Sequence, residues 1–334
     1  MVEVKCDRAK RMVRGLVSKT NVVPCLWGKP GIGKSDIVYQ VAKELEWDII
    51  EIRLGLMDPT DLKGLPYIKD GKAIWVSLGE LPDQDDKNHG ILFCDEMPQA
   101  APAVQGAASQ LLLNHRIGEY HLPEKWKIVI AGNPAGTGNV SFQMPVLIRN
   151  RVAHLDVVED LEAWKAWAWQ HEVDDRIISF LNFRQELLYK FTGKENAFPT
   201  PRSWAKCSIA LKALGDDGDL DELVASIVGD GPAAEFTAHL DVASKLPSLD
   251  KIFAGENIVP KDESVCYALL GALVSECKKR GVKTVERMFD YAMHLDAEYS
   301  VLLIKDLARA VGKEDVRGAK GAIKWAEKHK DVVL

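Results

Sequence analysis

The sequence lacks any apolar stretch approaching 18 residues, so it offers no candidate for a membrane-spanning helix. Its six cysteines are widely scattered and include no C-x-x-C pair, which argues against a zinc site and against a redox-active dithiol. Basic residues are not in excess, because 43 Lys and Arg stand against 49 Asp and Glu and give a net charge of −6. That sign opposes non-specific attraction to nucleic acid or anionic lipid, so we expect neither nucleic acid nor a membrane as a partner.

Internal repeats and low-complexity tracts are also missing, and the 47% apolar and 28% charged residues lie near the globular average. A chain of 334 residues has room for about two domains. The first eight residues include acids where a signal peptide would be basic and then apolar, so we expect a cytoplasmic protein. The cysteines are accordingly expected to be reduced thiols, most of them buried.

The first 160 residues alternate short β-rich runs with helical stretches, a pattern typical of a parallel sheet flanked by helices. Five runs are mostly apolar and bounded by polar, Gly or Pro segments, as strands covered on both faces require. We predict strands over Val22–Trp27, Asp48–Leu54, Gly90–Cys94, Lys127–Ala131 and Val152–Val157. Between the first two, residues 35–46 place apolar side chains on one helical stripe, which completes a β-α-β unit.

After residue 160, helical periodicity replaces the strand pattern. We expect helices over Arg176–Phe191, Arg202–Leu214, Asp219–Val228, Pro232–Ala243, Ser264–Lys279, Val285–His294, Ala297–Val311 and Val316–Lys328. The predicted organisation is an α/β nucleotide-binding domain over residues 1–158, a helical lid domain over 159–255 and a helical C-terminal region over 256–334.

The strongest chemical signal follows the first predicted strand, where the sequence matches G-x-x-x-x-G-K-[ST], the Walker A motif. The match comprises Gly28, Lys29, Pro30, Gly31, Ile32, Gly33, Lys34 and Ser35. Glycines let the backbone N–H groups of the loop point inward, and the next helix adds its positive end, so the loop forms a cradle for phosphate. We expect Lys34 to reach the β- and γ-phosphates of ATP and Ser35 to bind Mg²⁺.

A second signal ends the predicted strand at residues 90–94, where four apolar residues are followed by the adjacent carboxylates Asp95 and Glu96. Ligands of open α/β sheets bind at the carboxyl ends of the strands. We expect Asp95 to hold Mg²⁺ through water and Glu96 to polarise the attacking water. An isolated Asp-Glu pair would be a solvated strand end, but after a complete phosphate loop this Walker B pair predicts an ATPase.

These motifs resemble those of AAA+ ATPases, and specifically of the MoxR branch, over roughly residues 22–243. The resemblance implies a P-loop core with a five-stranded parallel sheet between helices, followed by an all-helical lid and a helical extension. Residues 128–134 resemble the sensor 1 strand, which gives Asn133 the role of positioning the lytic water. Residues 198–204 resemble the sensor 2 motif, which gives Arg202 a contact with the γ-phosphate.

The segment at residues 145–152 resembles the one that carries the arginine finger, which in this family acts on ATP bound by the neighbouring subunit. Arg151 is the first candidate and Arg149 the alternative. Val152 departs from the family pattern, which usually has an aromatic residue after the finger. Taken alone, each such arginine is also expected as the partner of a surface acid, and only the order of the motifs favours the catalytic role.

Two weaker matches to the family lie at residues 58–64 and at residues 119–123, where a hairpin preceding sensor 1 would sit. Between them, Tyr67 and Trp75 either face a central pore or pack within a hairpin. The resemblance implies a homo-oligomeric ring, expected to be a hexamer, that remodels or activates a protein partner in the manner of a chaperone. A protein with a von Willebrand factor A domain is the partner that the family suggests. The alternatives are a nucleic-acid motor or loader, and a scaffold that binds ATP without turnover.

Overall fold

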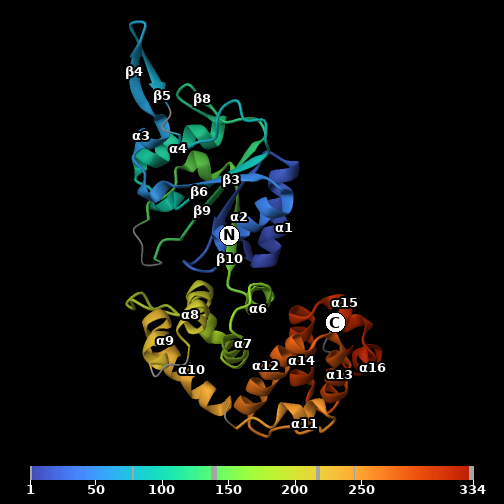
Figure 1. The fold of residues 1–334 in the computed structure, drawn as a ribbon. Coiled ribbons are helices and arrows are strands. Elements are labelled where there is room, and N and C mark those ends of the chain that lie inside the picture. Colours follow the sequence, from blue (N-terminus) through green and yellow to red (C-terminus); the bar gives the residue numbers. More distant parts are fainter. Residues whose placement is uncertain (1, 77–78, 137–140, 216–218, 244, 331–334) are drawn as a thin grey trace. The chain divides into compact units, whose positions relative to one another are not determined.

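The computed structural model describes residues 2–76, 79–136, 141–215, 219–243 and 245–330 (Figure 1). Residues 1, 77–78, 137–140, 216–218, 244 and 331–334, which the predicted domain ranges include, lie outside this described part. The chain divides into two compact units, residues 1–160 and residues 161–334. The three domain ranges given above stay a prediction. None of the helices in the described part combines the length and apolar character needed to span a bilayer.

The first unit is built on the predicted parallel sheet, which has one strand more than the five expected. In spatial order the strands are β1 (Val2–Lys5), β10 (Val152–Val158), β2 (Val23–Trp27), β9 (Trp126–Gly132), β6 (Gly90–Asp95) and β3 (Asp48–Arg53). The five predicted strands are all present, with ends shifted by one residue. The added edge strand β1 buries only Val4, so its sequence carries too little apolar pattern to predict it.

Side chains alternate between the two faces of this sheet, and each face has its own helices. Helices α1 (Cys6–Lys19) and α2 (Lys34–Leu45) cover one face, whereas α3 (Pro59–Lys63) and α4 (Pro102–Asn114) cover the other (Figure 1). The second face forms a core in which side chains of the sheet join those of α3, α4 and the short helix α5 (Val146–Arg149). Because β2, β9 and β6 are parallel neighbours, their carboxyl ends lie together at one edge of the sheet.

Two small hairpins and two 3₁₀ turns complete the first unit. They are β4 (Leu65–Lys69) with β5 (Lys72–Val76), β7 (Arg116–Ile117) with β8 (Tyr120–His121), η1 (Leu54–Leu56) and η2 (Met97–Gln99). The second hairpin lies where the sequence resemblance placed one before sensor 1. The first hairpin, β4 with β5, extends away from the rest of its unit (Figure 1).

The second unit is helical, as predicted. Its elements are α6 (Leu161–Gln170), α7 (Asp175–Phe183), η3 (Gln185–Leu188), α8 (Pro201–Leu214), α9 (Leu220–Val228), α10 (Asp230–Ala243), α11 (Leu249–Phe253), α12 (Glu263–Arg280), η4 (Val282–Thr284), α13 (Val285–Ala292), α14 (Ala297–Ala310), α15 (Lys313–Gly318) and α16 (Ala322–Lys328). Two predicted helices were too long. The first ends at Phe183 instead of Phe191, and the last is divided because Gly321 adopts a left-handed φ of 93°.

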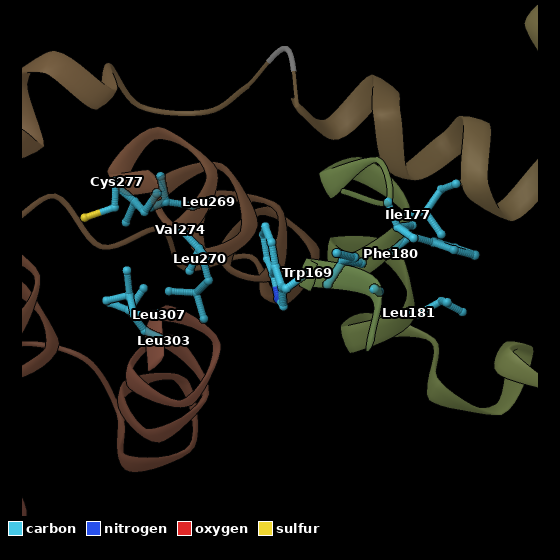
Figure 2. Close-up of a cluster of buried hydrophobic side chains, with 14 of the residues drawn as sticks. Trp169, Ile177, Phe180, Leu181, Leu269, Leu270, Val274, Cys277, Leu303 and Leu307 are labelled. Atoms are coloured by element: carbon cyan, nitrogen blue, oxygen red, sulfur yellow. The ribbon is translucent and has the colours of Figure 1, made fainter. Parts of the chain in front are cut away.

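A single cluster of buried side chains forms the core of the second unit (Figure 2). It joins Phe180 on α7 to Leu270 on α12 and Leu303 on α14, so residues on both sides of position 255 share one core. Trp169 at the end of α6 and Trp204 on α8 are buried in the same cluster.

Candidate nucleotide-binding site

The predicted phosphate loop lies between β2 and α2, at the carboxyl edge of the sheet. Gly28 and Gly33 adopt φ values of 154° and 100°, which L side chains rarely occupy. A Cβ atom on Gly28 would also lie 2.6 Å from the backbone oxygen of Val157 and 2.4 Å from Ile32 Cδ1. Gly28 and Gly33 therefore stand at positions that favour glycine, in a loop that leads from a strand into a helix, as phosphate-binding loops do.

Lys34 is the first residue of α2, and its side chain is only 8% exposed. Its Nζ donates hydrogen bonds to the backbone oxygens of Gly28 at 2.9 Å and Lys29 at 3.0 Å. It also donates to Oδ1 of Asn133, the residue directly after β9, over 2.7 Å. The structure thus brings the predicted phosphate-binding lysine and the predicted sensor 1 residue into contact.

Ser35 and Asp95 meet across the same edge, since Ser35 Oγ donates a hydrogen bond to Asp95 Oδ2 over 3.2 Å. A hydroxyl and a carboxylate are hard oxygen donors of the kind that Mg²⁺ binds together with water and substrate phosphates. Within the described residues, no group of three or more His, Cys, Asp or Glu side chains could hold a metal ion. The hydroxyl of Ser35 and the carboxylate of Asp95 fit Mg²⁺ bound together with nucleotide.

Glu96 follows β6 with a left-handed backbone, φ 58° and ψ 31°, which is uncommon for a residue with a side chain. Its backbone N–H donates to Asp95 Oδ1 over 2.8 Å, which holds the Asp95 carboxylate against the backbone of the turn at Glu96. Gly55 in η1 leaves room for the Glu96 side chain, because a Cβ at Gly55 would lie 2.7 Å from Glu96 Oε2. Strain of this kind concentrates at functional sites.

Two further contacts, which sequence motifs did not reveal, support the sensor 1 segment. Gln99 Nε2 in η2 donates to the backbone oxygen of Asn133 over 3.2 Å. Gly132 packs so closely on Pro98 that a Cβ there would lie 2.1 Å from Pro98 Cδ. These contacts tie the turn after the acid pair to the end of β9, although no local pattern in the sequence announces them.

Two residues next to the acid pair are Arg53 on the adjacent strand β3 and Cys94 on β6 itself. Arg53 lies opposite Asp95 in the β3–β6 register, and its Nε donates to Glu51 Oε1 over 2.8 Å. That bond to Glu51 raises the pKa of Arg53, and the carboxylates of Glu96 and Asp95 add to the effect. Burial raises the pKa of the Cys94 thiol to about 12, which favours its protonated form.

The candidate finger arginines lie on and just after α5. Arg149 and Arg151 are both exposed, and neither guanidinium has an ion-pair or hydrogen-bond partner among the residues that the structure describes. Arg202 belongs to the second unit, at the second position of α8, after the capping residue Thr200. A cation at the positive end of a helix is electrostatically unfavourable unless an anion binds there. The roles of all three arginines stay predictions.

Comparison with known proteins finds a family match for the segment that contains the loop and the acid pair. Residues 24–138 match the family model of AAA, the ATPase family associated with various cellular activities. The matched segment contains the phosphate loop, the acid pair and Asn133. No curated protein matches the chain by sequence.

Solved structures provide distant likenesses. The chain is similar to NtrX from Brucella abortus, with 14% identity over 97% of this chain and 67% of that one, at a TM-score of 0.42. It is also similar to the RuvB Holliday junction branch migration motor of Thermotoga maritima, with 15% identity over 81% of this chain and 78% of that one, at a TM-score of 0.38.

Proposed function

We propose that this chain is a Mg²⁺-dependent ATPase of the MoxR type that works in a ring and remodels a protein partner. The ATPase part rests on one observation, the convergence of four side chains at the carboxyl edge of three adjacent strands, β2, β9 and β6. Lys34 contacts Asn133 there, and Ser35 contacts Asp95. A phosphate-binding cation, two oxygen donors for Mg²⁺ and a polar group beside them are the parts that phosphoryl transfer requires.

In the proposed reaction, the loop amides and Lys34 hold the phosphates, and Ser35 and Asp95 hold Mg²⁺, the latter through water. Bound Mg²⁺ neutralises charge on the phosphate oxygens. Glu96 accepts a proton from the water that attacks the γ-phosphorus, while the bond from that phosphorus to the ADP oxygen breaks. Asn133 positions the water. A general base of this kind contributes about 10² to 10⁴ in rate.

The ring part of the proposal rests on the exposed side chains around α5. Val146 is 70% exposed and Leu147 is 53% exposed, and they precede Arg149 and Arg151, which lack partners within the described chain. Apolar surface beside unpaired cations fits an interface with a second copy, whose ATP Arg151 would reach. An arginine acting in this way is worth roughly 10³ or more in rate. A hexamer is the ring that the family resemblance suggests.

The partner-remodelling part rests on the family resemblance and on the β4–β5 hairpin. The two strands pair as an antiparallel hairpin. Tyr67 is 60% exposed, Ile68 75% and Trp75 44%, so the hairpin presents apolar side chains that a partner can contact. We propose that this surface contacts the protein that is remodelled, with a von Willebrand factor A domain as its expected kind. We also propose a cytoplasmic setting, in keeping with six free cysteines.

The test of the ATPase proposal is steady-state hydrolysis by the wild type and by Glu96→Gln, with light scattering on the same samples with and without ATP. Loss of turnover in Glu96→Gln together with an ATP-dependent ring supports the proposal. Glu124→Gln is the matched control, because Glu124 is exposed before β9, at the opposite end of the strand from Asn133. A monomer that binds ATP without turnover would contradict it, and stimulation by DNA or RNA would favour the nucleic-acid alternative.

Two variants test the ring and the partner separately. Mixing Arg151→Ala subunits with Glu96→Gln subunits should partly restore hydrolysis through composite sites, and no restoration would count against a finger acting between subunits. Tyr67→Ala should weaken ATPase stimulation by an added von Willebrand factor A protein while sparing the basal rate. Ile209→Ala, at an exposed apolar position of the second unit, is the control. Equal stimulation of Tyr67→Ala and wild type would contradict the hairpin's role.

A further inference from the structure

One hydrogen-bonded link connects the strand before the phosphate loop to the segment that carries the candidate finger arginines. Trp27 is the last residue of β2 and directly precedes Gly28 of the loop. Its indole Nε1 donates to Nδ1 of His154 on β10 over 2.8 Å, with the two ring planes 24° apart and their centroids separated by 6.1 Å. The two strands are adjacent and parallel, with His154 in register with Cys25.

The other ring nitrogen of His154 continues the link, since Nε2 lies 2.8 Å from the backbone oxygen of Arg149. An indole N–H can only donate, so Nδ1 of His154 must be the acceptor and carry no proton. The proton of the neutral imidazole is therefore on Nε2, which donates to the Arg149 carbonyl. The neighbours of His154 thus select one tautomer and one ring orientation.

The Arg149 carbonyl lies at the end of α5, where His154 gives it a hydrogen-bond partner. The last carbonyls of a helix have no partner within the helix, and α5 has only four residues, far too few to be stable alone. Buried Ile148 anchors the middle of α5 in the core, whereas the end of the helix, at Arg149, is exposed. His154 supplies the hydrogen bond at this end, immediately before Arg151.

We propose that His154 is a positioning residue for the arginine that serves the neighbouring subunit. By binding the end of α5 to Trp27, it sets residues 149–151 relative to the strand that enters the phosphate loop of the same subunit. This inference rests on the proposed function, because it assigns the arginines of one copy to the ATP of another. His154 itself touches neither ATP nor the reacting atoms.

The test uses composite sites, in which each subunit type supplies only one half. Donor subunits carry Lys34→Ala, so their own loop is inactive but their arginines are intact. Receiver subunits carry Arg149→Ala and Arg151→Ala, so their loop is intact but their arginines are absent. Hydrolysis in the mixture then reports only receiver loops served by donor arginines, and light scattering verifies that every mixture forms the same ring.

We expect His154→Leu in the donor to lower kcat of the mixture about tenfold or more, with KM for ATP unchanged, because misplaced catalytic groups cost rate and not ground-state binding. The same substitution in the receiver should change kcat less than twofold. His154→Gln in the donor should keep more activity than His154→Leu, because its amide nitrogen can still donate toward the Arg149 carbonyl. Trp27→Phe in the donor keeps the ring but loses the indole donor, and should fall between them.

Several results would overturn the inference. A defect that follows the receiver would mean that His154 supports its own phosphate loop. A defect of equal size in both subunit types would mean that His154 has a general structural role. A donor His154→Gln no better than His154→Leu would mean that the bond to Arg149 does not matter. If the mixture with intact His154 shows no hydrolysis at all, the proposed action between subunits fails first, so the two failures are distinguishable. Should His154→Leu fail to fold by circular dichroism, His154→Gln and Trp27→Phe decide the question.

Discussion

The ammonium group of Lys34 donates a hydrogen bond to Oδ1 of Asn133 over 2.7 Å and so joins the first turn of α2 to the end of β9. Two backbone oxygens of the phosphate loop accept from the same ammonium group. To bind Lys34, the γ-phosphate of ATP would have to replace these neutral oxygen atoms as the acceptor of its hydrogen bonds. This exchange links occupation of the loop to the position of Asn133.

Asn133→Asp should weaken ATP binding, whereas Asn133→Ala should lower turnover with little effect on binding. The aspartate would form an ion pair with Lys34 and would place a negative charge beside the phosphates, so we expect at least a tenfold rise in Kd, corresponding to about 1.4 kcal/mol. Fluorescent-ATP titration and steady-state ATPase rates give the two quantities. Equal ATP affinities for the aspartate and alanine variants would show that Lys34 is not held by Asn133.

Gly55→Ala should reduce kcat about ten- to a hundredfold without loss of ATP affinity, because misplacing a catalytic group by about 1 Å can have this effect. The new methyl group would lie 2.7 Å from Glu96 Oε2 and displace that carboxylate. Gly106→Ala is the control, since a Cβ there meets nothing within 4 Å and lies inside α4. That variant should keep full activity and gain about 1 kcal/mol of stability. Unchanged kcat in Gly55→Ala would contradict the assigned position of Glu96.

The parts of the site that sequence predicts are those whose chemistry is contiguous in the chain. The phosphate loop and the pair Asp95–Glu96 follow buried strands, and the parallel sheet brings their ends to one edge. The contacts of Gly55 and His154 could not be predicted from the sequence. Gly55 lies against Glu96 and His154 accepts from Trp27, and both partners are more than 40 positions away along the chain. No repeating pattern in the sequence marks such contacts. Their roles depend on packing distances that only the folded chain defines.

The fold shows the same division between strong and weak local signals. Five strands with buried apolar runs were predicted within one residue at each end, whereas β1 was missed because a four-residue edge strand with one buried side chain has no such run. The α7 prediction extended past Phe183 because apolar residues continue there in a 3₁₀ turn, η3, where the same spacing does not continue the helix.

Asp306→Ala should lower the free energy of unfolding by about 3 kcal/mol, because removing one partner of a buried ion pair leaves an uncompensated charge. Asp306 is 3% exposed and accepts from fully buried Lys165 over 2.8 Å, from Arg309 over 2.6 Å and from Asn182 over 2.9 Å. Without Asp306, the two cations would share the single carboxylate of Glu162. Urea denaturation of the full chain gives the value. Lys279→Ala is the control, since its pair with Glu276 is exposed and should contribute less than about 1 kcal/mol. Equal losses in both variants would mean that the α6–α14 network does not stabilise the second unit.

Stability should fall as the pH drops below about 6.5, in part because of His239. This histidine is 4% exposed on α10, where it stacks against Phe183, and burial lowers its pKa from 6.5 to about 4. The unfolded chain therefore binds a proton at a pH where the folded chain does not, so protonation favours unfolding between pH 6.5 and about 4.

The His239→Phe variant isolates this contribution, because phenylalanine keeps a ring beside Phe183 but does not titrate. The Ser179 hydroxyl, which lies 3.2 Å from His239 Nε2, keeps its bond to the Tyr267 backbone oxygen in the variant. The difference in unfolding free energy between wild type and variant should shift by about 2 kcal/mol against the wild type from pH 8 to pH 5. Urea titrations at the two pH values measure it. A difference that stays constant with pH would mean that His239 is protonated in the folded chain as readily as in the unfolded one.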